Sequence, residues 1–183
     1  MAEGERLREA LLELQMMRDR EARTLADTQT LLDCLEAYTT APNAGAALAS
    51  IFVSLQQKLG ATLTLLVTAS DADQEPQGAT ITASDDPALL GQRIAPPFDP
   101  FGRARNISNL ALLGAWGGGV EVDGFQSLIV MPASPNLALL TFRPPPTAFR
   151  RDDLRLVDRL TGLASQALRA SDLAKENTLL AAT

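Results

Sequence analysis

Two arginines and one tryptophan are the side chains in this sequence best suited to binding chemistry. Arg103 and Arg105 lie two residues apart, so they share a face if their segment is a strand. Pointing into the protein, they could hold an anionic ligand such as a carboxylate or phosphate. Pointing outward, they are surface charge, which is the commoner position of arginine. The sole tryptophan, Trp116, stands beside the glycine run 117–119 and is our first candidate for lining a pocket.

The possible nucleophiles lack the groups that would activate them. The sequence contains no histidine, which excludes histidine-ligated haem, histidine-type zinc sites, Ser-His-Asp triads and phosphotransfer to histidine on this chain. Ser127 is therefore expected to be a hydrogen-bonding residue on a strand. Cys34 lies among leucines and is expected to behave as a small apolar residue; redox sensing would need an exposed thiolate. We predict no catalytic residues and no metal site, because acidic pairs such as 152–153 fall in turns and helix starts.

Composition limits the class of protein. The 183 residues are 46% hydrophobic, which is enough for the core of one domain with helical extensions. The net charge of -6 and the absence of a basic run disfavour a nucleic-acid partner. No stretch reaches the roughly 18 apolar residues of a membrane span, and the charged start is unlike a secretory leader. A single cysteine forbids an intrachain disulfide, so we expect a cytoplasmic protein.

The first 40 residues are expected to form one long helix, which has strong helix formers and no proline. Its apolar residues repeat at heptad spacing and are interrupted by polar residues around 18–23. This stripe either packs against the domain's own terminal helix or forms a homodimeric coiled coil. We favour the homodimer because the period stays near 3.5 over several heptads, with an interface formed by Leu7, Leu11, Leu14, Leu25, Leu32 and Leu35.

The middle of the chain alternates between helix, strand and loop signals. Asn43 and Gly60 are placed to cap the two ends of a second helix. Strands are expected over 62–68 and 79–83, separated by a polar turn at 71–77. Asp86 and Pro87 predict a short helical turn, the segment from Arg103 to Ile107 predicts a short strand, and the proline-rich segment before it predicts a stiff loop.

Residues 124–172 organise the rest of the chain. Apolar runs at 125–131 and 137–142 are separated by a turn at Pro135 and Asn136, which predicts a hairpin whose first strand stops at Pro132. From Leu154 the apolar residues recur at three- and four-residue steps, which predicts an amphipathic helix. This helix continues past 172 without a breaker.

This order of features resembles a GAF domain, the sheet-and-helix sensor module of signalling proteins. The residues that carry the resemblance are Gly124-Phe125-x-Ser127-Leu128-x-Val130-x-Pro132, Leu139-Leu140-x-Phe142, Phe149, Asp153-Leu154 and Leu163-Ala164-Ser165-Gln166-Ala167. It implies an α/β (α+β) fold in which an antiparallel sheet carries packed helices and is flanked by long N- and C-terminal helices. The expected division is a signalling and dimerisation helix over 1–41, a sensor domain over 42–172 and the start of an output linker over 173–183.

The resemblance also implies a function. Residues 98–116 would form a lid over one face of the sheet, and the expected ligand-binding residues are Phe98, Phe101, Arg103, Arg105, Trp116, Phe125 and Ser127. The chain would be a non-enzymatic sensor in a bacterial signalling protein, passing a packing change to a histidine kinase, diguanylate cyclase or cyclic-di-nucleotide phosphodiesterase domain. Bilin, haem and cyclic GMP are disfavoured, which leaves an unidentified small ligand. The alternative is a ligand-free dimerisation scaffold whose cavity is filled by Leu110, Leu112 and Trp116.

Overall fold

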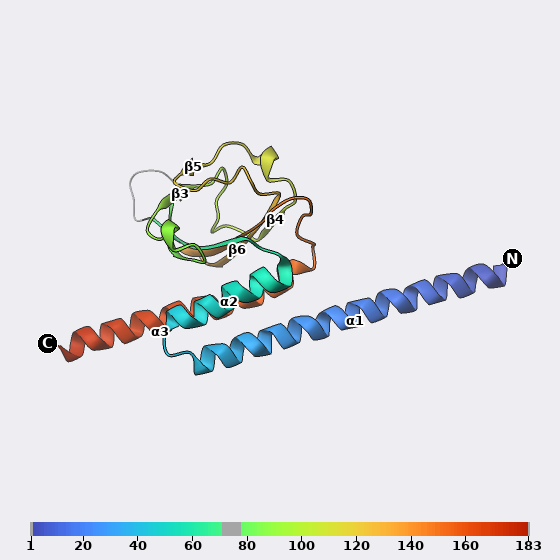
Figure 1. Cartoon of the computed structure of the whole chain (residues 1–183), viewed down its shortest axis with the longest axis horizontal. Coiled ribbons are helices and arrows are strands. Elements are labelled where there is room, and N and C mark those ends of the chain that lie inside the picture. The colour runs from blue at the N-terminus through green and yellow to red at the C-terminus, as the bar shows by residue number, and fades with distance from the viewer. Residues whose placement is uncertain (1, 71–77, 183) are drawn as a thin grey trace.

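A computed structural model describes residues 2–70 and 78–182 of the chain, so the turn predicted at 71–77 lies outside the described residues. These residues form one seven-stranded antiparallel sheet in the order β4-β6-β7-β1-β2-β3-β5. Figure 1 shows the helices on one side of this sheet and the loops between β2 and β6 on the other. The predicted α+β architecture with long terminal helices is confirmed.

The centre of the sheet consists of two hairpins joined edge to edge. In the first, β1 (Leu63–Ala69) pairs with β2 (Ala79–Ser84); in the second, β6 (Ser127–Ser134) pairs with β7 (Leu137–Arg143). The hairpins meet where β1 pairs with β7. Consecutive residues are buried along β1, β6 and β7 because both faces of these strands are covered.

The expected end of β6 at Pro132 is wrong. Pro132 lies inside the strand opposite Ala138, and the register shifts between Pro132 and Ser134. Such an irregularity accommodates a residue that has no N–H to donate, so the strand continues to Ser134.

Three short strands extend the sheet at its two edges. The predicted strand near Arg105 is β4 (Arg105–Ile107), which pairs with β6. At the other edge β3 (Arg93–Ala95) pairs with β2 and β5 (Gly117–Gly118) pairs with β3. Gly118 has a φ of 96°, and a Cβ there would overlap the Arg93 carbonyl group. The glycine run therefore permits a close approach between two backbones.

The helices α2 (Ala44–Leu59) and α3 (Asp153–Ala181) cover one face of the sheet. Asn43 caps α2, since its Oδ1 accepts a hydrogen bond from the Ala46 N–H at 2.9 Å, and Gly60 ends the helix with a φ of 65°. Both caps agree with the sequence analysis. The core on this face includes Ile51, Leu55, Leu66, Ile129, Leu139, Val157, Leu160 and Ala164.

A second core lies on the opposite face, beneath the loops. It includes Leu65, Val67, Ile81, Ile94, Leu110, Leu128, Val130, Leu140 and Phe142. Two 3₁₀ helices, η1 (Pro87–Leu89) and η2 (Leu110–Leu113), form part of this covering layer. The Asp86 side chain caps η1 as expected, accepting a hydrogen bond from the Ala88 N–H at 3.0 Å.

The long helix α1 (Ala2–Thr40) contacts α2 and α3 only through its C-terminal half. The packed face carries Thr30 and Cys34, both 2% exposed, with Leu31 and Tyr38 partly buried beside them. Packing against the domain's own helices therefore exists, on a face that excludes the predicted dimer seam. The seam leucines are exposed, for example Leu7 at 66% and Leu25 at 70%. Their role in a homodimer stays a prediction.

Candidate functional site

Four aromatic rings and one arginine form a cluster between the loops and the sheet, which we call the lid cluster: Phe98, Arg105, Trp116, Phe125 and Phe142. The Phe98 and Trp116 rings meet edge to face at 5.6 Å between centroids, and Trp116 lies 5.9 Å from Phe142. Phe125 packs on Phe142 at 5.1 Å. Most of the aromatic residues of the chain thus lie on this face of the sheet, whereas Tyr38, Phe52 and Phe149 belong to the core on the helix side.

Strand β4 directs Arg105 into this cluster. Arg105 lies opposite Val130 of β6, and Val130 belongs to the core beneath the loops. The guanidinium carbon of Arg105 stands 5.4 Å from the centroid of the Phe98 ring, which is a cation–π distance. Arg105 is therefore the inward-pointing arginine that the two-residue spacing allowed for.

Two buried donors in the lid cluster lack partners. Within 2–70 and 78–182, neither Arg105 Nε nor Trp116 Nε1 has a hydrogen-bond partner. Both groups are N–H donors, and both side chains pack on the Phe98 ring. A buried donor left without an acceptor costs about 1–3 kcal/mol. An acceptor oxygen from a ligand would relieve this cost, so the cluster is chemically suited to a carbonyl, carboxylate or phosphate group.

The remaining predicted ligand residues are spread more widely. Phe101 is partly buried against the same core, whereas Arg103 precedes β4 and is exposed. Ser127 is fully buried on the opposite face of the sheet, and its Oγ accepts a hydrogen bond from the Phe149 N–H at 3.0 Å. The structure brings Phe98, Arg105, Trp116 and Phe125 together and leaves Arg103 and Ser127 apart from them.

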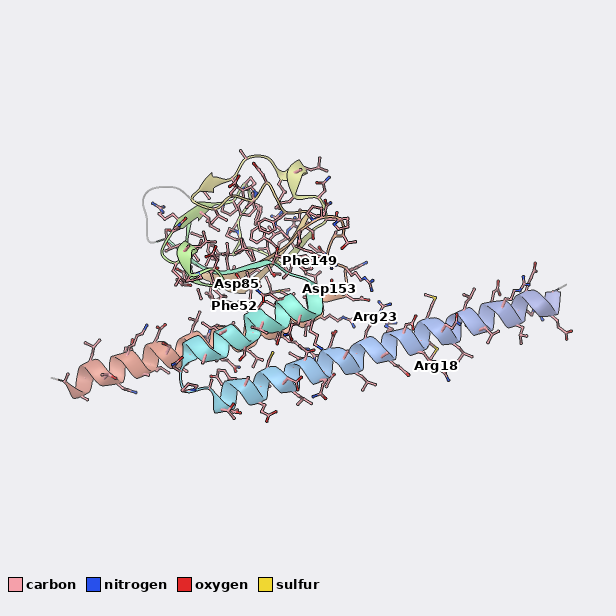
Figure 2. All side chains as sticks on the ribbon, in the orientation of Figure 1. Arg18, Arg23, Phe52, Asp85, Phe149 and Asp153 are labelled. Carbon is pink, nitrogen blue, oxygen red and sulfur yellow. The ribbon has the colours of Figure 1, made fainter. Side chains whose placement is uncertain are left out.

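Beneath the lid cluster, the other face of β4 reaches the start of α3. Asn106, the neighbour of Arg105, donates from Nδ2 to the Arg150 carbonyl at 3.2 Å. Arg150 is in turn held by Asp153, whose Oδ2 accepts from the Arg150 N–H at 2.7 Å. Figure 2 shows Phe149 and Asp153 at this junction between sheet and helix. Consecutive residues of one short strand thus contact the lid cluster and the segment that leads into α3.

Comparisons with solved structures identify the architecture. The GAF domain of a phosphoenolpyruvate-protein phosphotransferase from Coxiella burnetii superposes with a TM-score of 0.61 at 15% identity, over 82% of this chain and 96% of that one. The corresponding domain from Acinetobacter gives 0.60 at 14%, over 80% and 94%. The GAF domain of a protein assigned as a sensor histidine kinase from Pseudomonas syringae pv. tomato gives 0.58 at 14%, over 91% and 98%. The chain has a GAF fold. No family model and no curated protein matches the sequence.

The start of α3 in this GAF fold also contacts α1. Arg23 Nη1 lies 3.2 Å from Asp152 Oδ2, and Figure 2 shows Arg23 pointing from α1 toward the domain. Both side chains are more than half exposed, so the pair contributes at most about 1 kcal/mol. Nearby, burial and the negative charges of Asp153 and Asp152 raise the pKa of Asp27 above its usual 3.8, opposed by Arg159. The contact between α1 and α3 therefore combines the attraction between Arg23 and Asp152 with the repulsion of Asp27 by the two acidic residues at the start of α3.

Two hollows lie on the surface of the GAF-fold domain. A hollow of about 510 Å³ lies between α2 and β2, beside Phe52 and Asp85. The Asp85 carboxylate already accepts hydrogen bonds from Thr64 N–H at 3.0 Å and from Gln56 Nε2 at 3.2 Å. A second hollow of about 440 Å³ opens beside Trp116 and the glycine run, next to the lid cluster.

Candidates for metal or redox chemistry find no support in the described residues. Within 2–70 and 78–182, no group of three or more cysteine and acidic side chains is placed to bind a metal ion. Cys34 is buried against α2, where its Sγ lies 3.1 Å from Ser54 Oγ. Burial raises the pKa of the Cys34 thiol, which disfavours the reactive thiolate. Over the same ranges, no helix is long and apolar enough to cross a membrane.

Sequence reasoning missed Asn106 and the edge strands β3 and β5. Nothing in the sequence marks Asn106 as special, because its role depends on a carbonyl 44 residues away. Only the alternation of side chains along a strand would have predicted that Asn106 and Arg105 lie on opposite faces of the sheet.

Proposed function

We propose that this chain is a non-catalytic sensor module that binds a small ligand carrying an acceptor oxygen at the lid cluster and transmits its presence through α3. The observation that carries the proposal is the pair of buried, unpartnered donors, Arg105 Nε and Trp116 Nε1. A ligand oxygen at this position would gain charge-assisted hydrogen bonding from Arg105. The surrounding aromatic rings would contact the apolar part of the same ligand.

The residues favour binding over catalysis. The chain has no histidine, and Cys34 and Ser127 both lie on the helix side of the sheet, away from the lid cluster. A hydroxyl or thiol needs a neighbouring base, or a lowered pKa in the case of a thiol, to act as a nucleophile. The same fold occurs in the GAF domain of a protein assigned as a sensor histidine kinase and in a bilin-bound GAF domain of a cyanobacterial phytochrome. This similarity supports a sensory role. A covalent bilin is disfavoured here because the lid has no cysteine.

The route to an output runs along β4. A ligand that moves Arg105 would shift Asn106, which is bonded to the backbone that leads into α3. The helix α3 continues well past the sheet, and its far end and the start of α1 lie at opposite ends of the long axis (Figure 1). We propose that α3 passes this shift to an effector domain of the same cytoplasmic signalling protein, and that α1 joins two copies through its seam leucines. Only a ligand that binds two packings with different affinity could drive such a shift.

The scaffold alternative receives mixed support. Leu110 is buried and Trp116 is partly buried, as a filled cavity requires, but Leu112 is 82% exposed and fills nothing. A ligand-free scaffold would also leave the two buried donors unsatisfied, unless water reaches them.

Thermal unfolding in the presence of a metabolite library tests the proposal. A ligand specific for the folded state at 100 times its Kd should add about 2.7 kcal/mol to the free energy of unfolding. The library should contain carboxylates and phosphates with matched neutral compounds, and the fluorescence of Trp116 reports binding independently. Arg105→Gln should abolish the shift and Trp116→Phe should weaken it, whereas Arg103→Gln, an exposed control, should leave it unchanged. Equal shifts in the Arg105 variant and the wild type would refute the site.

A further inference from the structure

The exposed seam of α1 lies on the side of the helix opposite its packed face. The packed positions, such as Thr30 and Cys34, differ from the seam positions, such as Leu25 and Leu32, by about half a turn at 3.6 residues per turn. Figure 2 agrees, because Arg18 of the seam points away from the domain, in contrast to Arg23, which points toward it. A second chain could therefore lie on the seam without displacing α2 or α3.

Two charged residues interrupt the leucines at the middle of the seam. In heptad terms, Leu11, Arg18, Leu25 and Leu32 occupy one core position, and Leu7, Leu14, Glu21, Thr28 and Leu35 occupy the other. A parallel, in-register pair would place Arg18 against Arg18 and Glu21 against Glu21. These are two consecutive layers of like charge at the centre of the interface, which is unfavourable.

An antiparallel pair turns the same residues into attractive contacts. Antiparallel coiled coils place one core position opposite the other. Shifting the register by one heptad puts Arg18 opposite Leu14 or Thr28 and Glu21 opposite Leu11 or Leu25, so neither charge meets its counterpart. In the best register, Arg18 meets Glu21 of the partner subunit, and Glu21 meets Arg18 of the partner subunit. The flanking layers then pair Leu7 with Leu32 of the partner subunit, Leu14 with Leu25 of the partner subunit, and Leu11 with Thr28 of the partner subunit.

We propose that α1 binds α1 of a second copy in this antiparallel register, with the Arg18–Glu21 pairs fixing its orientation. The inference rests on the proposed dimerisation through the seam and adds the orientation. A charged pair in a mostly apolar seam adds little affinity but strongly specifies register, which is the best-attested use of such groups. Because α1 and α3 run in the same direction (Figure 1), the two α3 helices leave this dimer in opposite directions.

A distance measurement between two spin labels tests the orientation. The label is attached to Ala2→Cys in a Cys34→Ser background, in the full chain; Ala2 is exposed and lies off the seam. The antiparallel register separates the two labels by about 35 residues of helix, about 52 Å at 1.5 Å per residue. A parallel pair brings them within about 25 Å, the width of two neighbouring helices with their side chains.

Charge reversal tests the contacts themselves. Arg18→Glu places two glutamates opposite each other in each layer and should weaken the dimer at least about tenfold by sedimentation equilibrium. Adding Glu21→Arg to the same chain restores opposite charges and should recover the affinity in the antiparallel dimer. In a parallel dimer the double variant keeps like charges facing each other. Arg6→Glu, which makes the same change in net charge off the seam, is the control.

The outcomes separate the two levels of the inference. A monomer at micromolar concentration overturns the dimer and the orientation together. A dimer with a short label distance, or a double variant as weak as the single one, overturns the orientation and leaves the dimer standing. A distance of about 52 Å with recovery in the double variant supports both. Circular dichroism of each variant establishes that α1 remains helical.

Discussion

Replacing Ser127 with alanine measures how firmly the sheet holds the start of α3. The Ser127 hydroxyl is fully buried and accepts a hydrogen bond from the Phe149 N–H at 3.0 Å. Ser127→Ala leaves that N–H without an acceptor, which costs about 1–3 kcal/mol, whereas the lost oxygen leaves only a small void. For a domain of this size each kcal/mol corresponds to a change of about 2–4 °C in melting temperature. A decrease of about 2–12 °C is expected.

The measurement is a thermal unfolding curve supported by hydrogen exchange. The Phe149 amide should exchange faster in the variant, because its protecting acceptor is gone. Ser134→Ala is the control: Ser134 lies at the far end of the same strand, and its hydroxyl only accepts a hydrogen bond from an exposed turn at 3.3 Å. A melting temperature within 1 °C of wild type for Ser127→Ala, with unchanged Phe149 exchange, would refute the structural role that we assign to Ser127.

Three further changes test other parts of the fold. Gly118→Ala should lower the melting temperature by several degrees, since its Cβ would overlap the Arg93 carbonyl and its φ of 96° is unfavourable for alanine. Asp27→Asn should raise stability at neutral pH, because the raised pKa means that the charged form of Asp27 destabilises the folded state. That gain should shrink as pH falls toward and below the usual Asp value of 3.8, where Asp27 is protonated in both states; a gain that grows on acidification would contradict it. The Cys34 thiol should react slowly with a thiol reagent in the folded protein and rapidly in urea, and equally fast reaction in both would disprove its burial.

Local signals in the sequence were enough for the main elements and for one edge strand. Asn43 and Gly60 define α2 because capping is a local interaction, and the change from a period of two to a period near 3.6 separates β7 from α3. The strand at Arg105 followed from alternation alone. The end of β6 was misplaced because the effect of Pro132 depends on its partner across the ladder, which the sequence does not display.

The candidate site was predictable only in part. Aromatic residues and glycines marked the lid region, and the two-residue spacing placed both arginines on one face of an expected strand, whereas β4 begins only at Arg105 and leaves Arg103 exposed before it. The choice of Arg105 depends on its pairing with Val130, and that pairing joins segments that are separated in sequence. Ser127 was predicted to bind ligand but lies on the helix side of the sheet, hydrogen-bonded to Phe149. The sequence alone does not show which of the two layers covers a given face of a strand.

The shortness of the outermost strands affects how copies of this domain can associate. The sheet ends in β4 at one edge and in β5 at the other, which span three and two residues. So little free ladder offers almost no template for strand addition, and this is a common way for proteins to resist edge-to-edge aggregation. A continuous intermolecular sheet is thereby discouraged, and the dimer proposed through α1 uses no sheet edge.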